Sequence, residues 1–484
     1  MFIGRETELG YLEERYTDSK AQLIVFYGRR RIGKTETLRQ FCLGKPHVFY
    51  ACSQSPDALQ LANFSQRLLK EDIPAKRYIS QFSNWEDAFR AIGELPYGKQ
   101  KKLIVIDEFP YLCEGNPSVP SLLQNLWDSE LKNQNVMIIL CGSSMSFIEK
   151  ELLAEKNPLY GRATGIYRMG NMSFYEAAQF FPHYTDKDKV LAYAILGGIP
   201  HYLTQFDPDR SLADNIKRAI LTKGSVLYSE VEFLMHQELR ETATYNAILL
   251  AIAMGNTKLN DISQKSLIDN TAKTHIYLKN LMDLGLVARE FSIDTKIKKQ
   301  ANARHGSYRL TDAFFRFWYA FVFPNRSALE EGDVDGVYEQ LIHARLPAFA
   351  APIFEDVCLT FIQKRQRQRA LPFRYAYLGR WMGKTTLRDP RAPNGLRLGE
   401  TEIDLLAIDK DEKAYLVGEC KFQSSPFTMN EYLDTVAKLT PLKANADFYY
   451  ALFSAAGFDP QLQALAQNDH RLMLFDLPEI VRIR

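Results

Sequence analysis

The stretch QLIVFYGRRRIGKTETLRQFC, residues 22–42, decides how the first part of the chain folds. Gln22 is followed by an apolar run, LIVFY, that is rich in β-branched and aromatic residues, and this predicts a strand buried in a parallel sheet. The following residues fit a phosphate-binding loop, with Gly28, Gly33, Lys34 and Thr35 at the required spacing, and the remainder reads as a helix. A strand, a glycine loop and a helix in this order form the context in which such a loop cradles nucleotide phosphates.

Each residue type in this loop has a separate task at a bound nucleotide. The glycines let backbone N–H groups turn toward phosphate oxygens, and the helix N-terminus adds its partial positive charge. Lys34 would reach the outer phosphates and Thr35 would hold Mg²⁺. The three consecutive arginines either raise the positive potential of the loop or are simply solvated. The predicted nucleotide-binding residues here are Gly28, Arg29, Arg30, Arg31, Ile32, Gly33, Lys34, Thr35 and Glu36.

Two further apolar runs end in polar residues that extend the same site. In KKLIVIDEFPYL the apolar part ends at Asp107 and Glu108, and two carboxylates at the end of a buried strand are costly unless a cation uses them. Asp107 would complete the Mg²⁺ shell and Glu108 would polarise the attacking water, or both acids are solvated at an ordinary strand end. VMIILCGSS ends at Ser143, which either senses the terminal phosphate or belongs to a serine-rich turn.

Arg162, in the stretch NPLYGRATG, is a candidate for a contact between subunits. An arginine in this position can reach a nucleotide bound to a neighbouring subunit and stabilise transition-state charge, which would make the protein a homo-oligomer. The alternative is a surface arginine or a salt-bridge partner.

The whole-chain composition indicates a multidomain globular protein. The 484 residues are too many for one ordinary core and suggest about three domains. A formal net charge of +2 neither requires nor excludes nucleic acid as a partner. The six cysteines show no metal-binding spacing and fit a reducing cytoplasm. We see no signal peptide and no apolar run of the about 20 residues that a transmembrane helix needs, so we expect no membrane partner.

The motifs in the first 203 residues resemble those of a known family. FIGRETELGYL, GRRRIGKT, LIVIDEFPYL, ILCGSS, PLYGRAT and LGGIPHYL follow one another as in the archaeal-type ATPases, a group within the AAA+/STAND radiation of P-loop NTPases. The resemblance implies an ATP-binding domain, residues 1–205, with a helical lid. It also implies that Arg5 and Glu6 lie near the base or the subunit junction, and that Gly197 to Pro200 form a lid turn facing the nucleotide.

The pattern of residues 206–325 predicts the helical lid and a winged helix-turn-helix. Three short helices precede a basic stretch flanked by two strand-like runs, LVAREFSI and SYRLTDAFFRFWYAFV. The third helix would be capped near Asp269 or Asn270, with apolar positions at Ile276, Leu278, Leu281 and Met282. In a DNA-binding version it would enter the major groove; the alternative is a protein-packing module. The exposed candidates for DNA contact are Thr271, Lys273, Thr274 and Lys279, with Lys296, Lys298, Lys299 and Arg304 on the wing.

The last part, residues 326–484, carries a possible metal-dependent site. Asp404 lies in the apolar run GETEIDLLAID, and AYLVGECKF places Glu419 and Lys421 on one face of a neighbouring strand. Two carboxylates and a lysine around Mg²⁺ can bind a phosphodiester and lower the pKa of a water molecule, with Glu355 as a further carboxylate. The alternative is a structural strand pair with one buried ion pair.

This arrangement is similar to the PD-(D/E)XK nuclease superfamily, whose pattern maps onto Glu355, Asp404, Glu419 and Lys421, although Ile403 stands where that pattern has proline. A fold retained only for binding DNA is a third option. The basic run QKRQRQR, residues 363–369, either tracks a nucleic-acid backbone or is solvated.

Taken together, the sequence predicts a multidomain α/β protein with a P-loop NTPase parallel sheet and helical lid, a winged helix-turn-helix and a C-terminal α/β restriction-endonuclease-like domain. The predicted function is ATP hydrolysis with Mg²⁺ that is coupled to DNA binding and to Mg²⁺-dependent nucleic-acid cleavage in the cytoplasm. The alternative is a STAND-like regulatory nucleotide switch that recruits proteins and carries an inactive nuclease fold.

Overall fold

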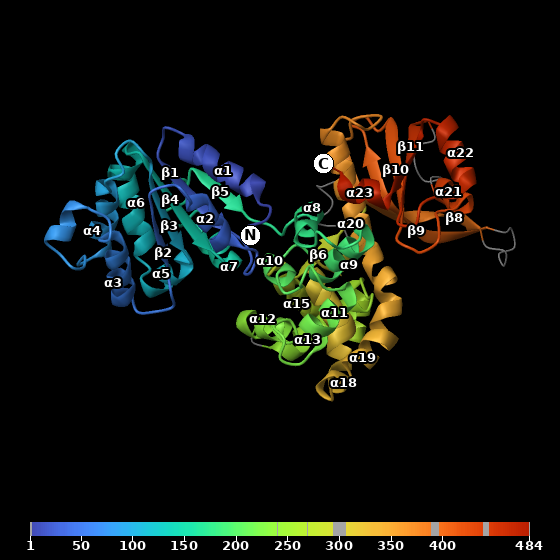
Figure 1. Cartoon of the computed structure of the whole chain (residues 1–484), viewed down its shortest axis with the longest axis horizontal. Coiled ribbons are helices and arrows are strands. Elements are labelled where there is room, and N and C mark those ends of the chain that lie inside the picture. The colour runs from blue at the N-terminus through green and yellow to red at the C-terminus, as the bar shows by residue number, and fades with distance from the viewer. Residues whose placement is uncertain are drawn as a thin grey trace. The chain divides into compact units, whose positions relative to one another are not determined.

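The computed structural model describes residues 2–239, 241–268, 270–293, 306–388, 396–438 and 445–483. These residues form two compact units. Unit 1 comprises the chain up to Glu176 together with Gly198–His201, and unit 2 comprises Ala177–Gly197 and the chain from Tyr202 onward. Figure 1 shows the helices and strands of both units.

Unit 1 is built on a five-stranded parallel sheet with the strand order β2-β3-β4-β1-β5. All residues of β1 and β4 are buried, which is why both strands read as continuous apolar runs rather than alternating ones. The strands are β1 Gln22–Tyr27, β2 His47–Ala51, β3 Lys102–Asp107, β4 Val136–Gly142 and β5 Gly165–Arg168.

Helices cover both faces of this sheet. Alternate residues of the strands, such as Val25 and Ile138, share one buried cluster with Phe64, Trp85 and Leu123 from the helices on one face. Figure 1 shows α1 and α2 on the other side of the sheet. The helices of unit 1 are α1 Glu6–Thr17, α2 Lys34–Cys42, α3 Asp57–Leu68, α4 Trp85–Arg90, α5 Phe109–Gly115, α6 Val119–Ser129 and α7 Met145–Phe147.

The first part of unit 2 is helical. Within it, α9 packs against both α17 and α20. Its helices are α9 Asp186–Leu196, α11 Leu212–Asn215, α12 Glu230–Glu238, α13 Thr242–Ala253, α14 Leu259–Lys265, α15 Thr271–Asp283, α17 Ala313–Phe317, α18 Arg326–Glu330, α19 Val334–Val337 and α20 Leu346–Arg367. Two short helices, α8 Phe174–Ala177 and α10 Pro200–Leu203, lie where the chain passes between the units.

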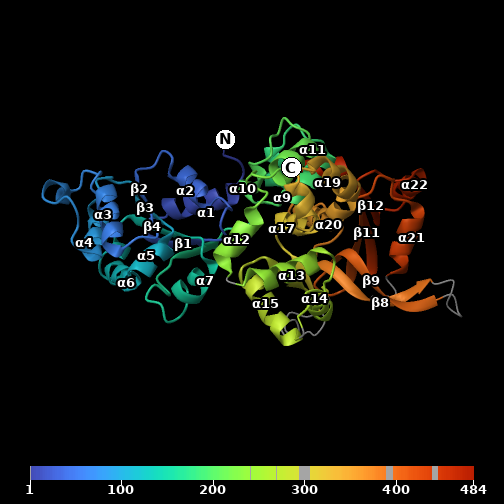
Figure 2. The ribbon, with the colours of Figure 1, turned by 90° about the horizontal axis from the view of Figure 1, so that it is seen from below.

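Helices α13, α14 and α15 pack on one another (Figure 2). They precede an antiparallel pair, β6 Val287–Glu290 and β7 Ser307–Leu310. This is the arrangement of a winged helix. The side chain of Asn270 caps α15 by accepting a hydrogen bond from the N–H of Ala272. The other expected cap residue, Asp269, and the wing residues Lys296, Lys298, Lys299 and Arg304 lie outside the described residues.

Three expectations for this part were wrong. Thr274 is fully buried, with its hydroxyl donating to Ser263 Oγ at 3.0 Å, so it does not face a groove. Ile276, expected at an apolar position, is 61% exposed. The run from residue 307 is a strand only up to Leu310, because Asp312 caps a new helix by accepting hydrogen bonds from the N–H groups of Phe314 and Phe315.

The second part of unit 2 is a five-stranded mixed sheet with the order β12-β11-β10-β9-β8. The pairs β8–β9 and β9–β10 are antiparallel, and β10–β11 and β11–β12 are parallel. Trp381 is buried in the core of this sheet and does not face solvent. The elements are β8 Tyr377–Arg388, β9 Leu396–Ile408, β10 Ala414–Lys421, α21 Met429–Ala437, β11 Asp447–Ser454, α22 Pro460–Asn468, β12 Leu472–Asp476 and α23 Leu477–Arg482.

One helical stretch, residues 334–367, is long and apolar enough to cross a membrane by length and composition alone. In this structure its residues Ile342, Ala350, Phe354 and Phe361 are buried within unit 2. Its apolar character therefore has an explanation in the packing of the core.

Candidate functional site

The glycine loop lies between β1 and α2, as the sequence predicts. Gly33 is the N-cap of α2 and has φ +89°, which favours glycine. A Cβ atom on Gly28 would lie 2.4 Å from the carbonyl oxygen of Met169 and 2.6 Å from Ile32 Cδ1. The loop therefore needs glycine at position 28 for close approach and at position 33 for its backbone conformation.

Lys34 is held inside this loop. Its ammonium group donates hydrogen bonds to the carbonyl oxygens of Gly28 and Arg29, both at 2.9 Å. The residue is 5% exposed, and this burial lowers the pKa of its ammonium group. The charge is thus placed within the loop by main-chain carbonyls, which are weaker partners than phosphate oxygens.

The ends of β3 and β4 bring the other predicted residues to the loop. Thr35 Oγ1 donates to Asp107 Oδ2 at 2.7 Å. Glu108 Oε2 accepts hydrogen bonds from the N–H (3.1 Å) and the hydroxyl (2.9 Å) of Ser143. Glu108 has φ +52°, a left-handed conformation that costs a non-glycine residue energy and is common at functional sites. These four side chains form one constellation at the carboxyl edge of the sheet.

Thr35 and Asp107 fit a Mg²⁺ ion. Both offer hard oxygen atoms, and their 2.7 Å contact places those atoms close enough to be ligands of one cation. Among the described residues, no group of three or more His, Cys, Asp or Glu side chains could by itself hold a metal ion. A Mg²⁺ ion here would take its remaining ligands from phosphate and water, as is usual for this metal.

The other predicted nucleotide-binding residues of the loop and of α2 differ in their exposure to solvent. Arg30 is exposed and donates to the hydroxyl of Tyr111 at 3.4 Å. Arg29 and Arg31 are half-buried, and Ile32 is buried. Glu36 is exposed and forms a 3.9 Å ion pair with Arg39.

Arg162 has a partner within its own chain. Its guanidinium group forms an ion pair with Asp128 at 3.1 Å and donates to the carbonyl oxygen of Tyr160 at 3.3 Å. The side chain is 37% exposed. The salt-bridge alternative therefore describes Arg162 in this structure, and its role toward a neighbouring subunit stays a prediction.

The turn that the resemblance places over the nucleotide contacts the loop. The carbonyl oxygen of Gly198 accepts a hydrogen bond from the N–H of Met172 at 2.7 Å. Pro200 Cγ would lie 3.6 Å from a Cβ atom on Gly33. The next residue, His201, is half-buried, and burial together with the nearby Arg31 lowers the pKa of its imidazole. His201 was missed from the sequence, because nothing in the local pattern placed it beside the loop.

In unit 2 the structure brings Asp404, Glu419 and Lys421 together. Asp404 is 8% exposed and Glu419 is 5% exposed. Glu419 pairs with Lys421 at 2.8 Å and with Lys438 at 2.7 Å. Asp404 Oδ2 accepts a hydrogen bond from the N–H of Cys420 at 2.8 Å. Lys438, at the end of α21, was missed because no strand pattern marks it.

The acids of this cluster repel one another. Burial raises the pKa of Asp404 to about 7, and the charges of Glu419 and Glu355 add to the effect. An acid in such a setting is relieved either by a proton or by a cation. We call Asp404, Glu419, Lys421 and Lys438 the C-terminal acidic site.

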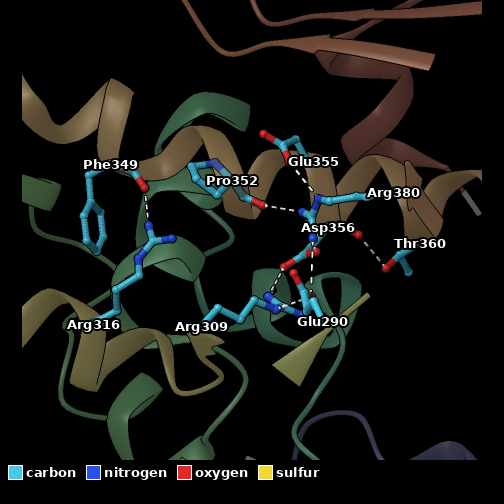
Figure 3. Close-up of polar contacts among 9 residues, drawn as sticks. All are labelled: Glu290, Arg309, Arg316, Phe349, Pro352, Glu355, Asp356, Thr360 and Arg380. Atoms are coloured by element: carbon cyan, nitrogen blue, oxygen red, sulfur yellow. Dashed lines mark hydrogen bonds and ion pairs between the residues drawn. The ribbon is translucent and has the colours of Figure 1, made fainter. Parts of the chain in front are cut away.

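Glu355 is held by an arginine (Figure 3). Arg380 Nε lies 2.9 Å from Glu355 Oε2, its Nη2 lies 2.9 Å from Asp356 Oδ1, and its Nη1 lies 3.6 Å from Glu290 Oε1. Arg309 pairs with the same Asp356 at 3.0 Å and also with Glu290. Burial raises the pKa of Glu355, while Arg380 opposes that change. The predicted metal ligand Glu355 therefore already has a cationic partner.

This network joins the hairpin β6–β7 to α20 and β8. The N–H of Ile293, just after β6, donates to the carbonyl oxygen of Arg380 at 2.9 Å, and Met382 N–H donates to Ser292 Oγ at 3.0 Å. The segment that follows β6 and the strand β8 are thus connected by one main-chain hydrogen bond and one hydrogen bond to a side chain, in addition to the ion pairs.

The basic run is tied to the end of the chain rather than free. Lys364 donates to the carbonyl oxygen of Ile483 at 3.3 Å, and Arg365 pairs with Glu479 at 3.8 Å. At least part of this run therefore serves packing within unit 2.

Comparison with known proteins gives matches over both units. Residues 2–206 match the family described as an ATPase domain predominantly from Archaea, and residues 318–432 match a family of archaeal and bacterial proteins of unknown function. An uncharacterized protein of Methanocaldococcus jannaschii is 33% identical over 423 residues, which is 87% of this chain and 88% of the relative. An uncharacterized ATP-binding protein of the same organism is 47% identical over 45 residues, 9% of this chain and 76% of that protein.

Among solved structures, the Walker-type ATPase of Pyrococcus abyssi has a TM-score of 0.50 and 21% sequence identity. The match covers 66% of this chain and 96% of that protein. This likeness supports the fold.

Proposed function

The chain belongs to the family of archaeal ATPases, and from this premise we propose that Mg²⁺ and ATP bound to unit 1 control an interaction of unit 2 with DNA. We assign three functional parts: the ATPase domain, residues 1–205; the lid and winged helix, residues 206–325; and the nuclease-like domain, residues 326–484. The observation that supports the ATP part most directly is the constellation of Thr35, Asp107, Glu108 and Ser143 beside the glycine loop.

The residues of the loop have distinct tasks in ATP binding. Lys34 exchanges the carbonyl groups of Gly28 and Arg29 for phosphate oxygens, which accept stronger hydrogen bonds from an ammonium group. Thr35 and Asp107 hold the Mg²⁺ ion, which neutralises phosphate charge when bound.

Glu108 orients and polarises the attacking water. Its carboxylate is bound by Ser143 in the structure, so Ser143 keeps it pointed across the ends of β3 and β4. Release of that carboxylate from Ser143 would make it available to the water molecule. Ser143 therefore has a place in the control of hydrolysis as well as in sensing phosphate.

The face of α15 supports the DNA proposal. Its exposed residues include Thr271, Lys273, His275 and Lys279, and the helix is the third of a winged-helix arrangement. Lysines on this face can neutralise DNA phosphates, and α15 corresponds to the recognition helix, which enters the major groove in DNA-binding proteins of this type. We propose duplex DNA as the partner, a homo-oligomer as the assembly in which Arg162 acts, and the cytoplasm as the location. All six cysteines are free thiols, which fits that location.

The buried C-terminal acidic site supports a second proposed activity, Mg²⁺-dependent cleavage of nucleic acid. Asp404 and Glu419 would hold the metal ion, and Lys421 would face the scissile phosphate. A bound Mg²⁺ ion supplies a water molecule of lowered pKa. Glu355 can join this site only if Arg380 leaves it.

The DNA proposal is tested by fluorescence anisotropy with a labelled duplex. We expect the affinity measured with a non-hydrolysable ATP analogue and Mg²⁺ to differ from the affinity measured with ADP. Equal affinities in the two states would mean that nucleotide does not control DNA binding. The cleavage proposal is tested on the same duplex, since Asp404→Asn should lose Mg²⁺-dependent cleavage and keep ATP turnover.

A further inference from the structure

Arg5 is a buried arginine beneath the glycine loop. It is 2% exposed and has φ +69°. Its Nη2 donates to the carbonyl oxygen of Ile32 at 2.7 Å, and its Nη1 donates to the carbonyl oxygen of Gly170 at 2.8 Å and to Glu8 at 3.0 Å. Burying a guanidinium group is costly, so each of these acceptors contributes to keeping it there.

The bond to Ile32 fixes more than one carbonyl group. The peptide bond between residues 32 and 33 is planar and trans, so its C=O and N–H groups point in opposite directions. With the oxygen of Ile32 held toward Arg5, the N–H of Gly33 must point away from Arg5. Gly33 lies at the N-terminus of α2, where backbone N–H groups bind phosphate.

The backbone of Arg5 is itself anchored. Glu176 Oε1 accepts a hydrogen bond from the N–H of Arg5 at 3.0 Å, and Glu176 Oε2 accepts from the N–H (2.8 Å) and the hydroxyl (2.9 Å) of Ser173. Backbone bonding by Arg5 and Ser173 lowers the pKa of Glu176 against the effect of burial. The guanidinium group is therefore presented to the loop from a fixed main chain, which makes its direction reproducible.

We propose that Arg5 is a positioning residue of the ATPase site, which acts through the Ile32–Gly33 peptide to aim the Gly33 N–H at a phosphate of ATP. Arg5 itself does not touch the nucleotide in this role. The same side chain also ties the loop to Gly170, so the conformation of the loop is coupled to the segment 170–176, which leads into unit 2.

Arg5→Lys tests the proposal, because lysine keeps the charge but cannot span the carbonyl groups of Ile32 and Gly170 with a planar fork. Arg67→Lys is the control: Arg67 is exposed and donates to the carbonyl oxygen of Phe49 at 2.9 Å, on β2, which β3 and β4 separate from β1. Both variants are measured for the dissociation constant of MgATP, for KM and kcat, and for the thermal midpoint.

Loss of one well-aimed hydrogen bond to a charged acceptor should weaken MgATP binding about 10- to 100-fold in Arg5→Lys. The control should bind as wild type does. We further expect that guanidinium ions at millimolar concentration restore part of the MgATP affinity of Arg5→Ala, which a general loss of stability would not allow. Arg5→Lys that is folded and binds MgATP like wild type would overturn the proposal, whereas wild type that does not bind MgATP would overturn the ATPase assignment itself.

If neither Arg5 variant folds, hydrogen exchange on the wild-type protein still tests the proposed role of Arg5. MgATP should slow exchange at the loop, residues 28–34, and at segment 170–176 together, because Arg5 joins them. Protection confined to the loop would contradict the coupling.

Discussion

Replacement of Asp404 by asparagine should make the protein more stable at pH 8 than wild type. The wild-type carboxyl group is buried next to Glu419 and Glu355, so its ionisation in the folded chain is unfavourable. Asparagine has nearly the same shape, stays neutral, and keeps an oxygen that can accept the hydrogen bond from Cys420 N–H. The difference in stability between wild type and Asp404→Asn therefore reports the effect of the charge on Asp404.

The size and the pH window follow from the pKa of Asp404, which rises from an ordinary 3.8 to about 7. Below about pH 4 this group is protonated in both the folded and the unfolded chain, so the two proteins should have similar free energies of unfolding. Between pH 4 and 7 the unfolded chain gives up the proton and the folded chain keeps it, so wild type loses stability as pH rises. Above pH 7 the difference should reach about 4 kcal/mol at most.

The assay is urea unfolding at pH 5 and pH 8. Unfolding is monitored by hydrogen exchange in peptides from β9 and β10, so that the measurement reports only the unfolding of the C-terminal sheet. Millimolar Mg²⁺ at pH 8 should stabilise wild type and not Asp404→Asn, because only the carboxylate is a good ligand. A difference that stays constant from pH 5 to pH 8 would refute the reasoning, since Asp404 would then be ionised and compensated throughout.

Three further predictions concern the ATPase and the DNA surface. Glu108→Gln should bind MgATP and lose about 100-fold or more in kcat, measured by phosphate release; unchanged kcat would remove Glu108 from the mechanism. Arg162→Ala should lower kcat about 10³-fold if it acts on a neighbouring subunit. If the Arg162→Ala variant has the same kcat as wild type at high protein concentration, that role is rejected. The double change Lys273→Ala and Lys279→Ala should reduce the salt dependence of DNA binding by about 2 in slope, while Lys99→Ala, on an exposed turn of unit 1, should leave it unchanged.

The loop and the strands of unit 1 could be predicted because their signals are local. A buried strand, a glycine loop and a helix start lie within about 20 residues, and the polar residues that follow β3 and β4 must meet at one edge of a parallel sheet. The contacts of Thr35 with Asp107 and of Glu108 with Ser143 follow from that geometry.

Other features depend on packing between distant segments and left no local signal. The sequence did not predict correctly which residues of α15 face the core. Thr274 packs against Ser263 on α14 and is buried, whereas Ile276 is exposed. Arg5 reaches Gly170 across 165 positions of the sequence, and Arg380 reaches Glu355 across 25. Such partners can be found only when the tertiary structure brings the segments together.

The most direct test of the central claim is ATP hydrolysis with and without duplex DNA, measured for wild type and for Lys34→Ala. Coupling between unit 1 and DNA predicts that duplex DNA changes wild-type turnover and that Lys34→Ala shows no turnover in either condition. Wild-type turnover that is lost in Lys34→Ala but is the same with and without DNA would contradict the claim and favour a nucleotide switch that recruits proteins.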